Sequence, residues 1–197
     1  MLRRLPIFPT IVVLIAVGIM IRLGFWQIDR LHQKEALVEE YTEAISSTRV
    51  SDLGNDLMID GPFEYSHVTL ECVRVTGLEM RAGRNARGVV GWADIAHCQF
   101  PFKLRGTSEA EVVIGWSLQP SQVEWKGGKV AGTVVPSKGS YIRIVADPPL
   151  AGLEANAVPD PRDIPNNHLS YAVQWFLFAG VALVIYALAV RKRLRGE

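Results

Sequence analysis

The sequence has little cysteine and almost no net charge, and each shortage excludes a class of protein. Two cysteines among 197 residues are too few for a disulfide-dense scaffold, and a 49% apolar composition excludes an intrinsically disordered chain. A formal net charge of +1 argues against a protein that binds nucleic acid along its whole length. The motifs GxSxG, HExxH, GxGxxG and the P-loop are also missing. A conventional hydrolase or transferase therefore has no visible active site in this chain.

Long apolar segments, by contrast, are present twice. Residues 5–21 and 169–190 form runs of 17 and 22 residues without a charged side chain, and a helix needs roughly 20 such residues to cross a bilayer. We expect transmembrane helices over 7–24 and 168–190. For the first, an uncleaved anchor is favoured over a signal peptide, because the apolar run is long and no small-residue cleavage site follows it.

The basic residues at the two ends of the chain predict its orientation. Two arginines precede the first apolar segment, and four of the last seven residues are basic. Cytoplasmic flanks of membrane helices are enriched in lysine and arginine, so the tails 1–6 and 191–197 should both be cytoplasmic. The segment between the spans should then lie outside the cytoplasm. From Leu23 to His168 it carries 14 basic and 19 acidic residues, a charge of −5.

The segment between the spans changes character along its length. Residues 25–48 favour a membrane-proximal amphipathic helix, since charged and apolar residues mix there without proline or glycine. Residues 49–157 contain short β-rich runs separated by turn residues, at 67–77, 87–98, 109–118, 128–136 and 140–150. We predict a mainly antiparallel β domain, either a sheet or a small barrel, followed by a proline-rich linker over 158–167. The expected class is a membrane protein with two transmembrane α-helices flanking an extracytoplasmic β domain, α+β overall.

The two cysteines leave two interpretations open. Cys72 and Cys98 are 26 residues apart, which is not the spacing of a metal or redox motif. Cys72 alternates with Val68 and Leu70, so burial as free thiols is favoured. A disulfide is the alternative in an oxidising compartment.

His168 differs from the other three histidines because it stands at the head of the second apolar segment. His67 and His97 are expected to be ordinary surface histidines, and an enzyme would need one of them against a carboxylate in a cleft. On a helix, Tyr171 and Trp175 lie within about 60° of His168. The same face carries small side chains, at Ala172, Ala179 and Ala182. A flat apolar macrocycle fits such a face, with the imidazole reaching its iron. Interfacial aromatics and helix–helix packing are the alternative explanations.

A second stripe of residues follows the first apolar segment. Arg22, Trp26 and Arg30 recur every four residues and share one helix face, with Gln27 beside it. The arginines could pair with carboxylates such as haem propionates. Contact with lipid headgroups is the alternative.

These two membrane-proximal patches resemble the SURF1 family. The segment LGFWQIDRLHQK (23–34) is similar to the family pattern LGxWQxxRxxxK, and PNNHLSYAVQWFLFA (165–179) to NNHLxYAxxWF. Weaker similarity lies between them, in GPFEYSHVTL (61–70), VVGWADI (89–95), VIGWSLQP (114–121) and GTVVP (132–136). The layout of two spans around an exported domain is similar too.

The resemblance implies an assembly factor for haem–copper cytochrome c oxidase in the bacterial inner membrane. It implies transient binding of haem a and its supply to the large oxidase subunit, with haem a synthase as a further partner. The family's haem-linked histidine corresponds to His168, its tryptophan to Trp26 and its arginine to Arg30. Such a protein is not an enzyme. The alternative is a membrane-anchored scaffold or regulatory subunit of a respiratory complex that binds no haem.

Overall fold

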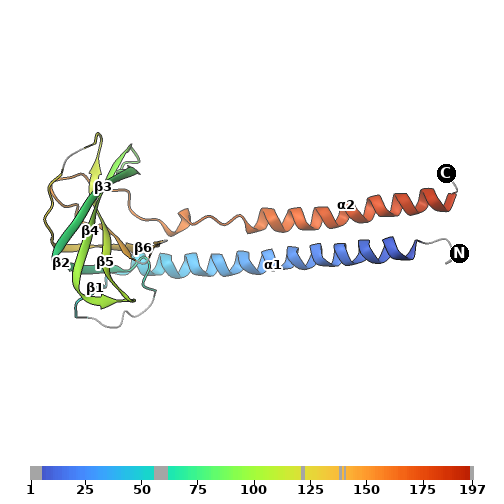
Figure 1. The fold of residues 1–197 in the computed structure, drawn as a ribbon, viewed down its shortest axis with the longest axis horizontal. Coiled ribbons are helices and arrows are strands. Elements are labelled where there is room, and N and C mark those ends of the chain that lie inside the picture. Colours follow the sequence, from blue (N-terminus) through green and yellow to red (C-terminus); the bar gives the residue numbers. More distant parts are fainter. Residues whose placement is uncertain (1–5, 56–61, 121–122, 138, 140, 196–197) are drawn as a thin grey trace. The chain divides into compact units, whose positions relative to one another are not determined.

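The computed structural model describes residues 6–55, 62–120, 123–137, 139 and 141–195. The chain divides into two compact units, Met1–Leu37 with Ile164–Glu197, and Val38–Asp163. In the first unit, the helices α1 (Ile7–Ser46) and α2 (His168–Arg195) run antiparallel, side by side (Figure 1). The hydroxyl groups of Thr10 and Tyr186 are hydrogen-bonded at one end of the pair, and Gln27 contacts His168 further along.

Both helices are long and apolar enough to cross a membrane. Only 11% and 6% of their most apolar windows are buried, which is not how the core helix of a soluble protein behaves. With 40 residues, α1 is about 60 Å long, roughly twice the hydrocarbon thickness of a bilayer. The chain is therefore a two-span membrane protein, and α1 continues without a break through the predicted membrane-proximal helix.

Small residues make room for side chains between the two helices. A Cβ atom placed on Gly24 would lie 2.6 Å from the ring of Phe176, so only glycine fits there. Ala172 and Ala179 of α2 are buried, as is Val17 of α1. Without a hydrophobic driving force inside a bilayer, such close packing is what holds membrane helices together.

The second unit is a seven-stranded sheet with the order β1-β2-β6-β7-β5-β4-β3. Its strands are β1 (Val50–Asp52), β2 (His67–Cys72), β3 (Arg74–Arg84), β4 (Val90–Leu104), β5 (Thr107–Ser117), β6 (Gly128–Val135) and β7 (Ile142–Ala146). The pairs β1–β2 and β5–β7 are parallel, and the other four are antiparallel. The predicted mainly antiparallel β domain is confirmed, with two parallel pairs added.

The sheet curls around its core. Val73 alone separates β2 from β3 in the chain, yet four strands lie between them in the sheet. The sheet must bend strongly for its far ends to meet, and Val73 donates a backbone hydrogen bond to Gln99 of β4 at 3.0 Å. Apolar side chains fill the enclosed space, the most completely buried being Val68, Leu70, Val112, Ile114, Val130 and Ile144.

The curvature also brings the two cysteines together. Cys72 on β2 and Cys98 on β4 form a disulfide, so the favoured prediction of free thiols is wrong and its alternative holds. Both cysteines are buried in the core, as their alternation with apolar residues indicated.

Two further expectations differ in detail from the structure. The β-rich run 67–77 is not one strand: it divides at Val73 into β2 and the start of β3. The segment 158–167 contains a short 3₁₀ helix, η2 (Pro161–Asp163). No glycine or proline separates the two strands, and only the adjacent apolar pair Cys72–Val73 interrupts the alternation, so the local pattern marks the change of strand weakly.

Candidate functional site

The first residue of α2 is held by a side chain of α1. The Nδ1 atom of His168 lies 2.7 Å from Oε1 of Gln27. A carbonyl oxygen can only accept, so Nδ1 must donate, and in the neutral ring the lone pair is then on Nε2. Among the described residues, no partner for Nε2 is found. Metal-binding histidines commonly have this arrangement, in which a hydrogen bond to one nitrogen orients the other.

The residues predicted to flank His168 divide between two environments. Ala172 and Ala179 are buried in the helix contact, so helix packing accounts for these small residues. Tyr171 remains exposed, and Trp175 is half-buried with its ring against Phe178 at a centroid separation of 6.3 Å. The aromatic part of the predicted face is therefore accessible, whereas most of the small-residue strip is covered.

On α1, the predicted stripe is exposed along its whole length. The guanidinium group of Arg30 lies over the ring of Trp26 at 5.9 Å and donates a hydrogen bond to Gln33 at 2.7 Å. At about 100° per residue, Arg30 is some 60° and Trp26 some 100° from the direction of Gln27. Arg22 is about 140° from that direction.

Helix geometry puts the aromatic residues of α2 on the same flank as Arg30. Viewed along α1 from its N-terminus, Arg30 is rotated to one side of Gln27. Viewed along α2 from its N-terminus, Tyr171 and Trp175 are rotated in the same direction from His168. In two antiparallel helices, residues that are rotated in the same direction from the contact lie on the same side of the pair. Arg30, Tyr171 and Trp175 therefore lie on one side. The opposite flank carries Phe25 and Phe176, whose rings are in edge contact at 5.4 Å. Arg30, Tyr171 and Trp175 thus border one open side of the Gln27–His168 contact.

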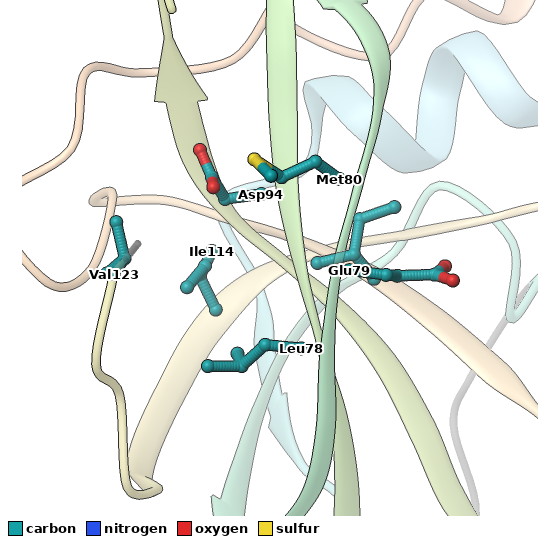
Figure 2. A pocket seen from close by; sticks show the side chains of 7 residues that line it. Leu78, Glu79, Met80, Asp94, Ile114 and Val123 are labelled. Carbon is teal, nitrogen blue, oxygen red and sulfur yellow. The ribbon is translucent and has the colours of Figure 1, made fainter. Parts of the chain in front are cut away.

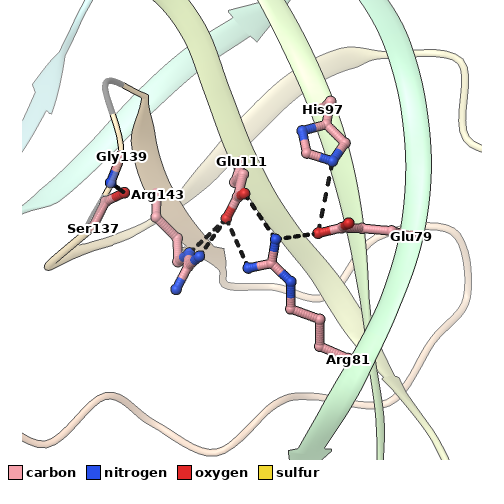
Figure 3. Close-up of polar contacts among 7 residues, drawn as sticks. All are labelled: Glu79, Arg81, His97, Glu111, Ser137, Gly139 and Arg143. Carbon is pink, nitrogen blue, oxygen red and sulfur yellow. Dashed lines mark hydrogen bonds and ion pairs between the residues drawn. The ribbon is translucent and has the colours of Figure 1, made fainter.

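A second polar cluster lies within the β domain, centred on Glu111 of β5 (Figure 3). The Glu111 side chain is only 2% exposed. Arg143 of β7 donates to its carboxylate from Nε and Nη2 at 2.8 and 2.5 Å, and Arg81 of β3 donates at 3.1 and 3.3 Å. Burial by itself would raise the pKa of Glu111, but the hydrogen bonds from Arg143 and Arg81 outweigh it, and the pKa is lowered.

The cluster extends to Glu79 and His97. Arg81 pairs with Glu79 at 2.5 Å, and Nε2 of His97 lies 3.7 Å from the same carboxylate. The ligand atoms of Glu79, His97 and Glu111 all lie within 4.8 Å of one another, close enough for a metal ion. Arg81 bridges both carboxylates, however, and a second guanidinium is bound to Glu111. These two cations already neutralise the two carboxylates, so we assign the cluster a role in holding the strands together.

His67 is satisfied on both ring nitrogens. Its Nε2 lies 2.9 Å from the carbonyl oxygen of Ile45, near the end of α1, and its Nδ1 lies 3.1 Å from the hydroxyl group of Thr133. Nε2 must therefore donate, and in the neutral ring Nδ1 accepts. The residue closes the last turn of α1 against β2 and β6, which matches the expectation of an ordinary hydrogen-bonded histidine.

A cavity of about 260 Å³ opens beside β3 (Figure 2). Leu78, Met80 and Ile114 give it an apolar lining, and the carboxylate of Asp94 accepts a hydrogen bond from Ser117 at 2.8 Å. Its lining residues are Leu78, Glu79, Met80, Asp94, Ile95, Ile114 and Val123. Neither His67 nor His97 is among them. This cavity therefore lacks the pair of a histidine and a carboxylate that the enzyme alternative would need.

Comparison with known proteins identifies one family. The SURF1 family model matches residues 14–180, which are 167 of the 197 residues and include both membrane-proximal motifs. No match is found among curated proteins.

Proposed function

The chain belongs to the SURF1 family, and from this premise we propose that it binds haem a and presents it to the large subunit of cytochrome c oxidase. Family membership implies a role in the assembly of that oxidase, and the family is one of assembly factors, not a known class of enzyme. The haem step and the identity of the recipient are our proposal.

The contact between Gln27 and His168 is the observation that carries this proposal. It directs one ring nitrogen of His168 toward α1 and leaves Nε2 with the lone pair that iron requires. The hydrogen bond also fixes the rotation of the imidazole about its side-chain bonds. A histidine held in this way loses little freedom on binding a metal, which favours coordination.

The flank that borders His168 supplies the other contacts. Tyr171 and Trp175 offer apolar ring surface for a macrocycle, and Arg30 offers a guanidinium for a propionate carboxylate. Arg30 is closer than Arg22 to the direction of Gln27, so we place the propionate contact at Arg30 and keep Arg22 as a second candidate for a propionate or a lipid headgroup. Trp26 supports Arg30 through their cation–π contact at 5.9 Å.

A carrier must also release its cargo. If His168 were the single ligand that this chain gives to the iron, the haem would be held strongly enough to be carried and weakly enough to be passed on. The exposed position of Tyr171 and the half-buried position of Trp175 support lateral exchange, because both rings have surface open to a ligand.

We further propose that the protein lies in the bacterial inner membrane with its β domain outside the cytoplasm. The basic tails support that orientation, and the Cys72–Cys98 disulfide supports an oxidising compartment for the domain. In this position the β domain is available to the large oxidase subunit and to haem a synthase.

Purification of the full-length chain from cells that synthesise haem a tests the proposal. We expect a haem Soret band in the wild-type protein, and its loss or displacement in His168→Ala. His32→Ala is the matched control, because it removes a histidine of α1 instead and should retain the band. A wild-type protein without haem would contradict the proposal and favour a scaffold. A band unchanged in His168→Ala would contradict the ligand assignment.

A further inference from the structure

One edge of the sheet is open over a short, bounded length. β3 is the last strand in the sheet order, so within the part of the chain that the structure describes, one side of it has no neighbouring strand. A β-bulge between Val75 and Gly77 ends the regular part at one end. At the other end, the carbonyl group of Arg84 accepts a hydrogen bond from Ala157 at 2.9 Å. The open edge is therefore Gly77–Gly83, and Met80 is its middle residue.

The backbone groups that face outward along this edge can be assigned. The carbonyl group of Arg84 points away from β4 and accepts its hydrogen bond from Ala157. The amide of the next residue, Asn85, points the other way and donates a hydrogen bond to Val89 at 3.1 Å. Neighbouring residues of a strand alternate in this direction. Leu78, Met80 and Ala82 therefore present their N–H and C=O groups to the outside.

The side chains along the edge divide by chemistry. Leu78 and Met80 are apolar yet 48% and 39% exposed, and both point into the cavity beside β3, whereas Glu79 points to the other face (Figure 2). Arg81 lies on the face of Glu79 and pairs with it. One face of the edge is thus apolar and the other carries one acid and one base.

We propose that this edge joins a second copy of the same chain, with two β3 strands pairing antiparallel about a two-fold axis through Met80. In that register Met80 faces Met80 of the second copy and Leu78 faces Ala82. Glu79 faces Arg81, so each acid meets a base, and Gly77 faces Gly83. The outward groups of the three residues on each strand form six backbone hydrogen bonds.

The palindromic pattern favours a second copy over an unrelated strand. A two-fold interface must be self-complementary. The sequence LEMRA (78–82) reads apolar, acidic, apolar, basic, apolar in one direction. In the other direction the acid and the base exchange places, so two antiparallel copies match each other. Proteins usually protect exposed edge strands, and the opposite edge strand, β1, is only three residues long. The bulge between Val75 and Gly77 limits the regular edge to the seven residues that this pairing uses.

Single cysteines test the register in the full-length chain, with the native disulfide kept oxidised. Directly opposed residues have Cα atoms about 5.5 Å apart, so Met80→Cys should be cross-linked to dimer by a short thiol-specific reagent. Leu78→Cys is the matched control, since two copies of residue 78 are four residues out of register, about 13 Å. A mixture of Leu78→Cys and Ala82→Cys chains should cross-link again. Equal cross-linking of Leu78→Cys alone, or none of Met80→Cys, would overturn the proposal.

Light scattering of the purified protein in detergent provides an independent measurement. We expect the wild-type chain to be a dimer and Met80→Lys a monomer, because two like charges would then meet at the axis. Val158→Lys adds the same charge at another exposed apolar position and should remain a dimer. A monomeric wild-type chain, or a dimeric Met80→Lys chain, would overturn the proposal and leave β3 as an edge for a different protein.

Discussion

Gln27 and His168 are 141 residues apart in the sequence and joined by a hydrogen bond of 2.7 Å. The bond connects α1 to the first residue of α2. It determines which nitrogen of the imidazole can bind a metal, and it sets the direction in which that nitrogen points. One histidine at the end of this helix pair thereby has a defined hydrogen-bonding state and orientation.

Replacement of Gln27 should change the tautomer of His168 in the haem-free protein. Gln27→Leu removes the acceptor for Nδ1–H, so we expect a mixture of the two neutral tautomers in place of the single Nδ1–H form. Nitrogen-15 NMR of the labelled imidazole distinguishes the two forms directly. Gln27→Glu is the control, because its carboxylate still accepts from Nδ1. Indistinguishable His168 spectra in wild type and Gln27→Leu would contradict the assigned role.

Gly24 should be the least replaceable glycine of α1. A Cβ atom there lies 2.6 Å from the Phe176 ring, so Gly24→Ala should lower the unfolding free energy by about 1–3 kcal/mol, as overpacking does. Gly18→Ala is the control, since nothing lies within 4 Å of its added Cβ. Thermal unfolding in detergent measures both. Equal stability of the two variants would show that the helices do not pack at Gly24.

Glu111 should make the β domain sensitive to acid. Its pKa is lower in the folded state than its ordinary value, because the hydrogen bonds from Arg143 and Arg81 outweigh burial. The contribution of Glu111 to the unfolding free energy is therefore complete above its pKa in the unfolded chain, about 4.3. It is lost as the pH falls through the lower pKa of Glu111 in the folded state. Glu111→Gln should remove about 3 kcal/mol at neutral pH, because it leaves two guanidinium groups without their buried partner.

Denaturant unfolding over a pH series checks this expectation. The wild-type and Glu111→Gln curves should converge in acid, since protonation of Glu111 has the same effect as the substitution. Asp160→Asn is the control, because its pair with Arg162 is on the surface and should contribute little. Wild-type stability in Glu111→Gln at neutral pH would contradict the importance of the network.

The disulfide should contribute measurably to the stability of the β domain. Cys72 and Cys98 close a loop with a sequence separation of 26 residues, for which chain entropy predicts about 3.5 kcal/mol. Replacement of both cysteines by alanine should lower the unfolding free energy by a comparable amount. Alkylation of the denatured, unreduced wild-type protein should detect no free thiol. Complete alkylation without reductant would contradict the disulfide.

The helices and most of the strands were predictable because each is determined by local pattern. The apolar runs around Val17 and Ala179 require helices of membrane length, and the alternation of Val68, Leu70 and Cys72 requires a strand with one buried face. The division of residues 67–77 was hard to predict, because no turn residue lies between the two strands and only the adjacent apolar pair Cys72–Val73 interrupts the alternation. The parallel pairing of β5 with β7 is likewise a long-range property that local sequence does not specify.

The site was predictable only in part. His168 was identifiable from its position at the head of an apolar span, but its partner Gln27 was noted only as a neighbour of the arginine stripe. That contact depends on how two distant helices rotate against each other. The disulfide depends on sheet curvature, and the Glu111 network on side chains from β3, β5 and β7 that share no sequence motif.

The central claim is that His168 gives this chain its function in oxidase assembly. The most direct measurement is oxidase activity with haem a content in membranes of a strain lacking the gene, complemented by wild type, His168→Ala or His32→Ala. The account predicts that wild type and His32→Ala restore both quantities, whereas His168→Ala restores neither although it accumulates to the same level. Full restoration by His168→Ala would contradict the account.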